Sequence, residues 1–272
     1  GAPNARAGLS VVFAPTGATI PANGMVLKAS KIRGVDSNGM LCSASELGLS
    51  DDHEGIIELS PDAPIGAPIA GVMGLNDPMI DVSITPNRPD CLGVHGIARD
   101  LAASGMGMLK SGAVEAVPGN GPCTVDIGLR FEGVALPACP MFAGRLVTGV
   151  KNGPSPDWLR QRLEAVGLRS ISALVDITNY ISMDRARPLH VYDAGTLRGQ
   201  IHARLGRAGE KLLALDGKEY AVDAADCVIA DDTGVLGFGG VIGGAPSGCT
   251  DATVNVFIES AYFDHRIIRK TA

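Results

Sequence analysis

The sequence predicts an α+β protein, in which a partial β-barrel precedes a larger, strand-rich domain that mixes helices and strands. Short apolar runs separated by Gly, Pro and Asn fill the first 58 residues, which is typical of a small barrel or sandwich. From Cys123 onward, strand-like runs far outnumber helix-like runs. The length of 272 residues suits two domains.

The N-terminal part, residues 1–58, is predicted to contain strands at 10–14, 26–32 and 39–42. Residues 59–120 are predicted to connect the domains through a strand at 80–84 and a helix from Asp90 to about Ser104. Leu92, Ile97 and Leu101 would share one face of that helix, and Asp90 would face the positive end of its dipole. Residues 105–121 are rich in Gly, Ala and Pro, which marks them as a domain boundary.

The larger domain, residues 121–272, contains a predicted helix between Ser155 as the N-cap and Gly167 at the C-terminal end. Asp216-Gly217 indicates a β-hairpin that returns into a strand at 220–222. Further strands are expected at 143–150, 173–181, 200–205, 211–215, 227–231 and 254–259.

Composition narrows the possible functions. A formal net charge of −6 argues against general polyanion binding, which depends on Lys and Arg contacts with phosphates. The six cysteines and five histidines show no metal-ligand spacing, so we expect no metal site. The scattered cysteines indicate a reduced protein of the cytoplasm. The sequence contains no run of about 18 apolar residues, so we expect no membrane span. Because the chain starts at Gly1 without Met and stops without a terminating turn, we expect a fragment of a longer polypeptide.

Glu259 and His190 are the first candidate functional residues. Glu259 ends an apolar run, where a carboxylate either caps the fold through backbone N–H groups or faces a pocket, since burying it unpaired is costly. His190 could exchange hydrogen bonds near neutral pH or simply pack in a loop. From the local sequence alone, both interpretations stay open for each residue.

A second set of candidates lies in the same domain. Arg169 could contact a phosphate or carboxyl group of a ligand, or act as a solvated cation at a helix end. Thr178 and Asn179 could offer donors or merely end a strand. Gly240 and Gly243 belong to a glycine run that matches neither a dinucleotide fingerprint nor a P-loop. Such glycines favour close backbone approach to a ligand or to another strand.

The order of the motifs resembles the β subunits of bacterial phenylalanyl-tRNA synthetases. Residues 31–43 resemble their tRNA-binding OB-fold, although too few strands are present for the five that an OB-fold needs. The resemblance continues through 85–90 with the helix that follows, and then through 167–170, 176–180, 187–193, 215–217, 237–244 and 257–261. The combination is specific, whereas each short motif is not.

The resemblance implies binding of tRNA(Phe), association with an α subunit, and hydrolytic editing of mischarged Tyr-tRNA(Phe). It implies that Glu259 recognises the tyrosine hydroxyl, that His190 lines the pocket, and that Arg169 helps to place the acyl-adenosine end. Thr178 and Asn179 would lie on a pocket strand, and Gly240 and Gly243 would leave room for the ring. Hydrolysis would use a positioned water and the terminal ribose of the tRNA, without a covalent nucleophile.

Other implications concern the complete enzyme. ATP and Mg²⁺ would serve aminoacylation in the α subunit, and no cofactor, DNA partner or membrane is expected for this fragment. A segment beyond Ala272 would complete the editing pocket. The alternative is a non-catalytic RNA-binding or subunit-assembly module with the same architecture.

Overall fold

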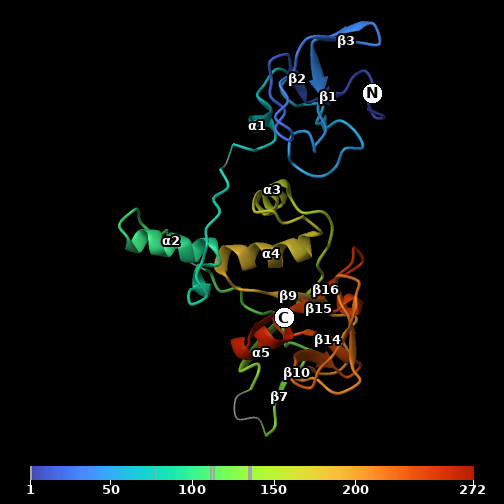
Figure 1. The fold of residues 1–272 in the computed structure, drawn as a ribbon. Helices are drawn as coiled ribbons and strands as arrows, with labels where there is room; N and C mark the ends of the chain where they lie inside the picture. Colours follow the sequence, from blue (N-terminus) through green and yellow to red (C-terminus); the bar gives the residue numbers. More distant parts are fainter. Residues whose placement is uncertain (1, 77, 111, 113, 134–136) are drawn as a thin grey trace. The chain divides into compact units, whose positions relative to one another are not determined.

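The computed structural model describes residues 2–76, 78–110, 112, 114–133 and 137–272. Two compact units divide the chain, Gly1–Ile80 and Asp81–Ala272, and Figure 1 shows the elements of each. The predicted connecting segment 59–120 is therefore divided between the two units: residues 59–80 belong to the N-terminal unit and residues 81–120 belong to the second. No helix in the described ranges is long and apolar enough to cross a membrane.

The N-terminal unit contains short strands that pair two by two. The antiparallel pairs are β1 (Ser10–Val11) with β6 (Glu58–Leu59), β2 (Phe13–Pro15) with β5 (Gly39–Leu41), and β3 (Ser30–Ile32) with β4 (Val35–Ser37). Among the described residues these strands form no closed barrel. A short helix, α1 (Ile69–Val72), follows them, and Val12, Ile20 and Cys42 form the core.

Only residues 30–32 of the strand predicted at 26–32 form a strand, β3, while Val26 makes an isolated bridge with Thr19. Arg33 and Gly34 both have positive φ, at 50° and 82°. Two consecutive residues of this kind make a tight turn whose twist suits a hairpin. The turn joins β3 directly to β4, so it fixes where β3 ends and where β4 begins.

The second unit is built on two main sheets. The larger sheet has the order β15-β14-β13-β10-β7 and the smaller has the order β8-β16-β9; the strands are β7 (Ile127–Arg130), β8 (Met141–Thr148), β9 (His190–Asp193), β10 (Ile201–Leu205), β13 (Cys227–Asp231), β14 (Gly234–Phe238), β15 (Ile242–Gly243) and β16 (Asn255–Tyr262). Tyr192 and Phe257 from the smaller sheet pack with Ile201 and Ile229 from the larger one. The main core of the unit therefore lies between the two sheets.

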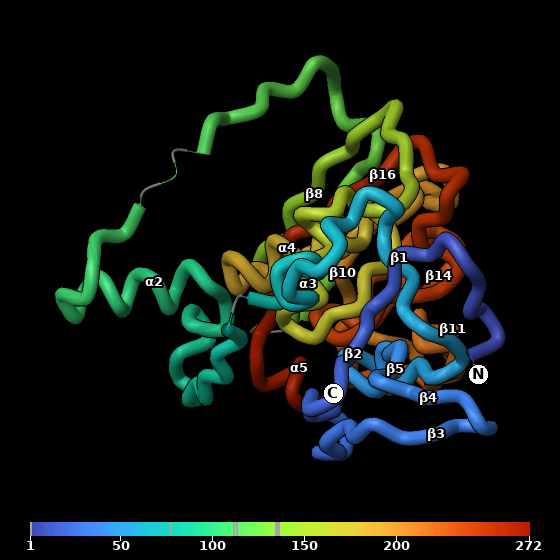
Figure 2. Tube along the Cα trace, turned by 90° about the horizontal axis from the view of Figure 1, so that it is seen from above, coloured from blue at the N-terminus to red at the C-terminus, as the bar shows by residue number. Residues whose placement is uncertain are grey.

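The second unit also contains helices. They are η1 (Pro89–Cys91), α2 (Val94–Ala103), α3 (Asp157–Ala165), α4 (Ala173–Arg185), η2 (Ala245–Ser247) and α5 (His265–Thr271). Figure 2 shows α2 standing away from the sheets of its own unit, near one end of α4. That neighbourhood leaves no space for a side chain at Gly93, where a Cβ would meet the Met183 carbonyl oxygen at 3.0 Å.

Several local predictions are confirmed. The hairpin at Asp216-Gly217 joins β11 (Lys211–Leu213) to β12 (Glu219–Ala221) in antiparallel register. Strand β13 has the predicted bounds, and the chain leaves α3 at Gly167, whose φ is +80°. The hairpin and the end of α3 depend on turn or end residues that act on their immediate neighbours.

The strand predicted at 173–181 is wrong, because this segment is the helix α4. Its β-branched residues suggested a strand, but propensity yields to tertiary context. The buried Asp176 carboxylate accepts hydrogen bonds from the Ser155 and Ser170 hydroxyls and from the Ile171 N–H. Tyr180 also packs edge-on against Trp158 of α3, with ring centroids 5.6 Å apart. Both contacts hold this segment as a helix beside α3.

Two smaller predictions are also wrong. Residues 80–84 form no strand, and Ile80 is 78% exposed, so no neighbour covers an extended segment there. Ser155 is not the N-cap of α3, since the helix begins at Asp157 with Pro156 as its N-cap. The Ser155 hydroxyl instead bonds to Asp176.

Candidate active site around Glu259 and His190

Strands β9 and β16 place the two first candidates opposite each other. In their antiparallel register, Glu259 is the direct partner of His190, and Phe257 is the partner of Tyr192. Alternate residues of a strand share one face, so all four side chains lie on the same face of the small sheet. Directly opposed residues have Cβ atoms about 5 Å apart, which makes Glu259 and His190 neighbours although 68 positions separate them in the sequence.

Glu259 is a buried carboxyl group with one side-chain hydrogen bond among the described residues. It is 6% exposed, and the Tyr192 hydroxyl donates to its Oε2 atom at 2.6 Å. Burial raises the pKa of Glu259 to about 7, and the hydrogen bond from Tyr192 opposes that rise. This group can therefore gain or lose a proton near neutral pH, which an exposed glutamate does not do.

His190 is a neutral imidazole whose Nε2 atom is buried without a hydrogen-bond partner among the described residues. Burial lowers the pKa of His190 to about 4. Its ring meets that of Tyr192 edge-on, with centroids 4.4 Å apart. An unpaired buried nitrogen is unfavourable in the free protein, and it can serve a ligand that supplies the missing partner.

Gly243, on β15, brings backbone close to the imidazole. A Cβ at this position would lie 2.6 Å from His190 Nε2 and closer still to Cε1. The prediction that these glycines permit close approach therefore has a specific partner at Gly243, which is the His190 ring. Gly240 differs, because it is exposed, has a φ of +72°, and lies beside Phe263 and Ile268.

The remaining predicted residues lie on or near α4. Thr178 is buried and donates to the Val175 carbonyl oxygen of its own helix, and Asn179 is half-buried beside it. Arg169 is exposed in the segment between α3 and α4. Within the described ranges, none of these three residues is a hydrogen-bond partner of Glu259 or His190. The structure thus brings together His190, Glu259 and Gly243 from the predicted set.

Tyr192 is the residue that the sequence analysis missed. It is 1% exposed and touches both Glu259 and His190. The spacing His190-Val191-Tyr192 contains a usable signal, since residues two apart on a strand point to the same side. That signal is usable only where residues 190–193 are predicted as a strand, and no strand is predicted there from the sequence.

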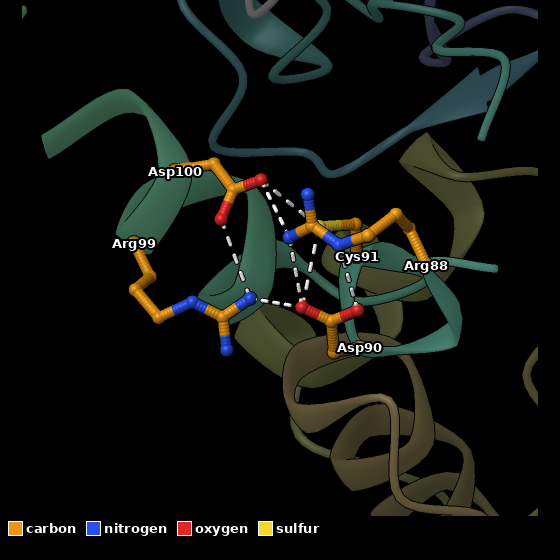
Figure 3. A network of polar contacts seen from close by, with 5 residues as sticks. All are labelled: Arg88, Asp90, Cys91, Arg99 and Asp100. Atoms are coloured by element: carbon orange, nitrogen blue, oxygen red, sulfur yellow. Dashed lines mark hydrogen bonds and ion pairs between the residues drawn. The ribbon is translucent and has the colours of Figure 1, made fainter. Parts of the chain in front are cut away.

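One group of possible metal ligands exists in the described part of the chain, away from this site. The ligand atoms of Asp90, Cys91 and Asp100 lie within 4.8 Å of one another. Figure 3 shows that Arg88 and Arg99 already pair with the two carboxylates. Hydrogen bonds from Arg88 and then Arg99 hold the pKa of Asp90 well below its ordinary value. This cluster joins η1 to α2 by ion pairs, and its oxygens are not free for a cation.

Two surface hollows also lie apart from Glu259. One of about 310 Å³ is in the N-terminal unit, next to Asn4 and Ile56. The other, of about 440 Å³, is in the second unit, where Arg130, His202 and Asp232 contribute to its wall. Both acidic and basic side chains line the second hollow, and Arg204 is already paired with Glu210 at 2.6 Å.

Comparisons with known proteins cover both units. Residues 1–68 match the putative tRNA binding domain family, and residues 138–272 match the B3/4 domain family. The chain is 56% identical over 97% of its length to the phenylalanine–tRNA ligase β subunit of Rhodopseudomonas palustris, of which it covers 32%. It is 55% identical over its whole length to that of Bradyrhizobium diazoefficiens, of which it covers 33%. The chain belongs to the phenylalanine–tRNA ligase β-subunit family.

The family match agrees with the division of the fold. The tRNA binding domain match lies within the N-terminal unit, and the B3/4 domain match contains β8, β9, β15 and β16, and with them Glu259, His190 and Gly243. The chain spans about a third of the length of these β-subunit relatives. A solved N-terminal fragment of the phenylalanyl-tRNA synthetase β subunit from Pyrococcus horikoshii is 17% identical, with a TM-score of 0.40 over 66% of this chain and 54% of that one.

Proposed function

We propose that this chain supplies tRNA binding and hydrolytic editing of Tyr-tRNA(Phe) to a phenylalanine–tRNA ligase. Membership in the β-subunit family supports both roles. In this proposal the chain acts in the cytoplasm with an α subunit, which carries out the ATP- and Mg²⁺-dependent aminoacylation. The N-terminal unit contacts tRNA, and the second unit contains the editing site.

The observation that carries the editing proposal is the buried carboxyl group of Glu259 opposite a neutral His190. A hydrophobic pocket rejects an added hydroxyl group only modestly, by about a hundredfold. A buried acceptor discriminates better, because a tyrosine hydroxyl would satisfy it, whereas phenylalanine would leave it unpaired. Glu259 is such an acceptor, since only its Oε2 atom has a protein partner within the described residues.

Hydrolysis in this proposal needs no protein nucleophile. A water molecule held near the scissile ester attacks its carbonyl carbon, and the leaving oxygen is the terminal ribose hydroxyl of the tRNA. The neutral His190 offers its unpaired Nε2 as a hydrogen-bond partner for the ligand or for that water. In this proposal Arg169 helps to place the acyl-adenosine end, Thr178 and Asn179 contribute to the pocket from α4, and Gly240 leaves room for the ring.

The test compares deacylation of Tyr-tRNA(Phe) and Phe-tRNA(Phe) by the complete ligase containing this sequence. The wild-type enzyme is expected to release tyrosine selectively. Glu259→Ala should abolish the preference, because the phenol then finds no buried acceptor. Glu115→Ala is the matched control, since Glu115 is exposed in an irregular segment. An undiminished preference in Glu259→Ala would refute the assignment, and the absence of selective release by the wild type would favour a binding or assembly module.

A further inference from the structure

The hydroxyl group of Tyr192 occupies the kind of position that a ligand phenol would take at Glu259. It donates to Oε2 at 2.6 Å from a side chain that is itself 1% exposed. Within the described chain, no hydrogen bond goes to the other carboxylate oxygen, Oε1. The protein therefore already binds one phenol at this carboxyl group, through its own strand β9.

Tyr192 is held firmly enough to impose an orientation. Its ring contacts His190 edge-on and lies 6.4 Å from the ring of Phe257, and it belongs to the core between the two sheets. A side chain that is packed on all sides keeps one rotamer. Since Tyr192 cannot move away readily, Glu259 is fixed by its Oε2 atom, and only Oε1 remains for a ligand.

We propose that Tyr192 is a positioning and specificity-determining residue, which holds Glu259 by one oxygen and presents the other to the hydroxyl group of a tyrosyl ester. The inference rests on the proposed editing function and extends it to a residue that contacts no substrate atom. Preorganised acceptors discriminate better than mobile ones, because no free energy is spent on ordering them when the ligand binds.

The surroundings of Glu259 leave Tyr192 as the main group that favours its ionised form. His190 faces Glu259 from β9 and is neutral at pH 7, because burial lowers its pKa to about 4. The nearby thiols of Cys139 and Cys227 are buried and uncharged, each with a pKa raised to about 12 by burial in the first place. Gly144, opposite Glu259 on β8, adds no charge. Without the Tyr192 hydroxyl, no hydrogen bond would counteract the effect of burial on Glu259, so the pKa of Glu259 should rise further.

Tyr192→Phe tests the inference, because it removes one oxygen atom and keeps the ring. Tyr220→Phe is a matched control, since Tyr220 also donates to a carboxylate, Asp216, at 2.7 Å, but lies on the surface hairpin. The ¹³Cδ chemical shift of Glu259, followed by NMR against pH, should report a higher pKa in Tyr192→Phe and an unchanged one in Tyr220→Phe. This measurement does not depend on editing, so it separates failure of the inference from failure of the proposed function.

The second measurement is deacylation of Tyr-tRNA(Phe) by the complete ligase. We expect kcat/KM for Tyr-tRNA(Phe) to fall about tenfold in Tyr192→Phe, while slow release of phenylalanine stays unchanged. An increase in tyrosine release would overturn the inference, because it would mean that Tyr192 competes with the ligand phenol. An unchanged Glu259 pKa together with unchanged selectivity would overturn it as well, and would leave Tyr192 as a packing residue only.

Discussion

Glu259 and His190 are neighbours whose burial shifts their pKa values in opposite directions, to about 7 and about 4. For Glu259, the folded protein holds its proton more tightly than the unfolded chain, so its stabilising contribution is complete below pH 4.5 and is lost as the pH rises to 7. For His190, the contribution is present above pH 6.5 and is lost as the pH falls towards 4. Near pH 5.5, Glu259 makes the free energy of unfolding fall with rising pH, whereas His190 makes it rise. The pH dependence of the wild-type protein therefore does not reveal either contribution by itself.

Glu259→Gln separates the two contributions, because glutamine keeps an acceptor for Tyr192 but does not titrate. The free energy of unfolding of this variant, relative to wild type, is expected to increase by up to about 3 kcal/mol between pH 4.5 and 7. Urea unfolding at a series of pH values measures the difference. A difference that stays constant over this range would contradict the raised pKa of Glu259, and Glu115→Gln provides the control at an exposed glutamate.

Helix α4 shows how a buried polar residue decides the state of an element. Burial by itself would raise the pKa of Asp176, but hydrogen bonds from Ser155, Ser170 and the Ile171 N–H outweigh that effect and lower it. The carboxylate thus ties the segment before α3 to the first turn of α4. The helix ends at Arg185, and its C-cap residue Ala186 has a positive φ of 51°, after which the chain continues to β9 and the candidate site.

Asp176→Ala should destabilise the second unit, because three donors lose their acceptor inside the protein. We expect a loss of about 3 kcal/mol in the free energy of unfolding, as is usual when a buried, hydrogen-bonded charge is removed. Chemical unfolding followed by far-UV circular dichroism measures it. Asp157→Ala in the first turn of α3, where the side chain is 84% exposed, should have a much smaller effect, and equal losses in the two variants would refute the role of Asp176.

The whole chain consists of two units, each with a core of its own. Val12, Ile20 and Cys42 belong to the core of the N-terminal unit, whereas the residues around Tyr192 and Phe257 form that of the second. The segment near residue 80 lacks regular structure and exposes Ile80 and Val82. Exposed segments of this kind are preferred sites of proteolysis.

Limited proteolysis is therefore expected to cut near residue 80 and to separate the N-terminal unit from a fragment that contains residues 81–272. Because the candidate site lies within one unit, this fragment should keep the Tyr192–Glu259 hydrogen bond and the raised Glu259 pKa. Mass spectrometry of the fragments and the ¹³C titration of Glu259 check both expectations. Early cuts within β8–β16, or a fragment that unfolds on release, would show that the second unit depends on the first.

The sequence by itself determined the features that depend on residues close together in the chain. The hairpin at Asp216-Gly217 follows from its turn residues, α3 from its apolar spacing and Gly167, and the family from the order of motifs along the chain. It also marked Glu259 and His190 as candidates, but their local sequences left a structural and a functional interpretation open. Only the tertiary structure decided that α4 is a helix, because the contacts of Asp176 and Tyr180 come from other segments. Likewise, only the register of β9 against β16 joins Glu259 to His190 and Tyr192, since strand pairing links residues that are distant in sequence.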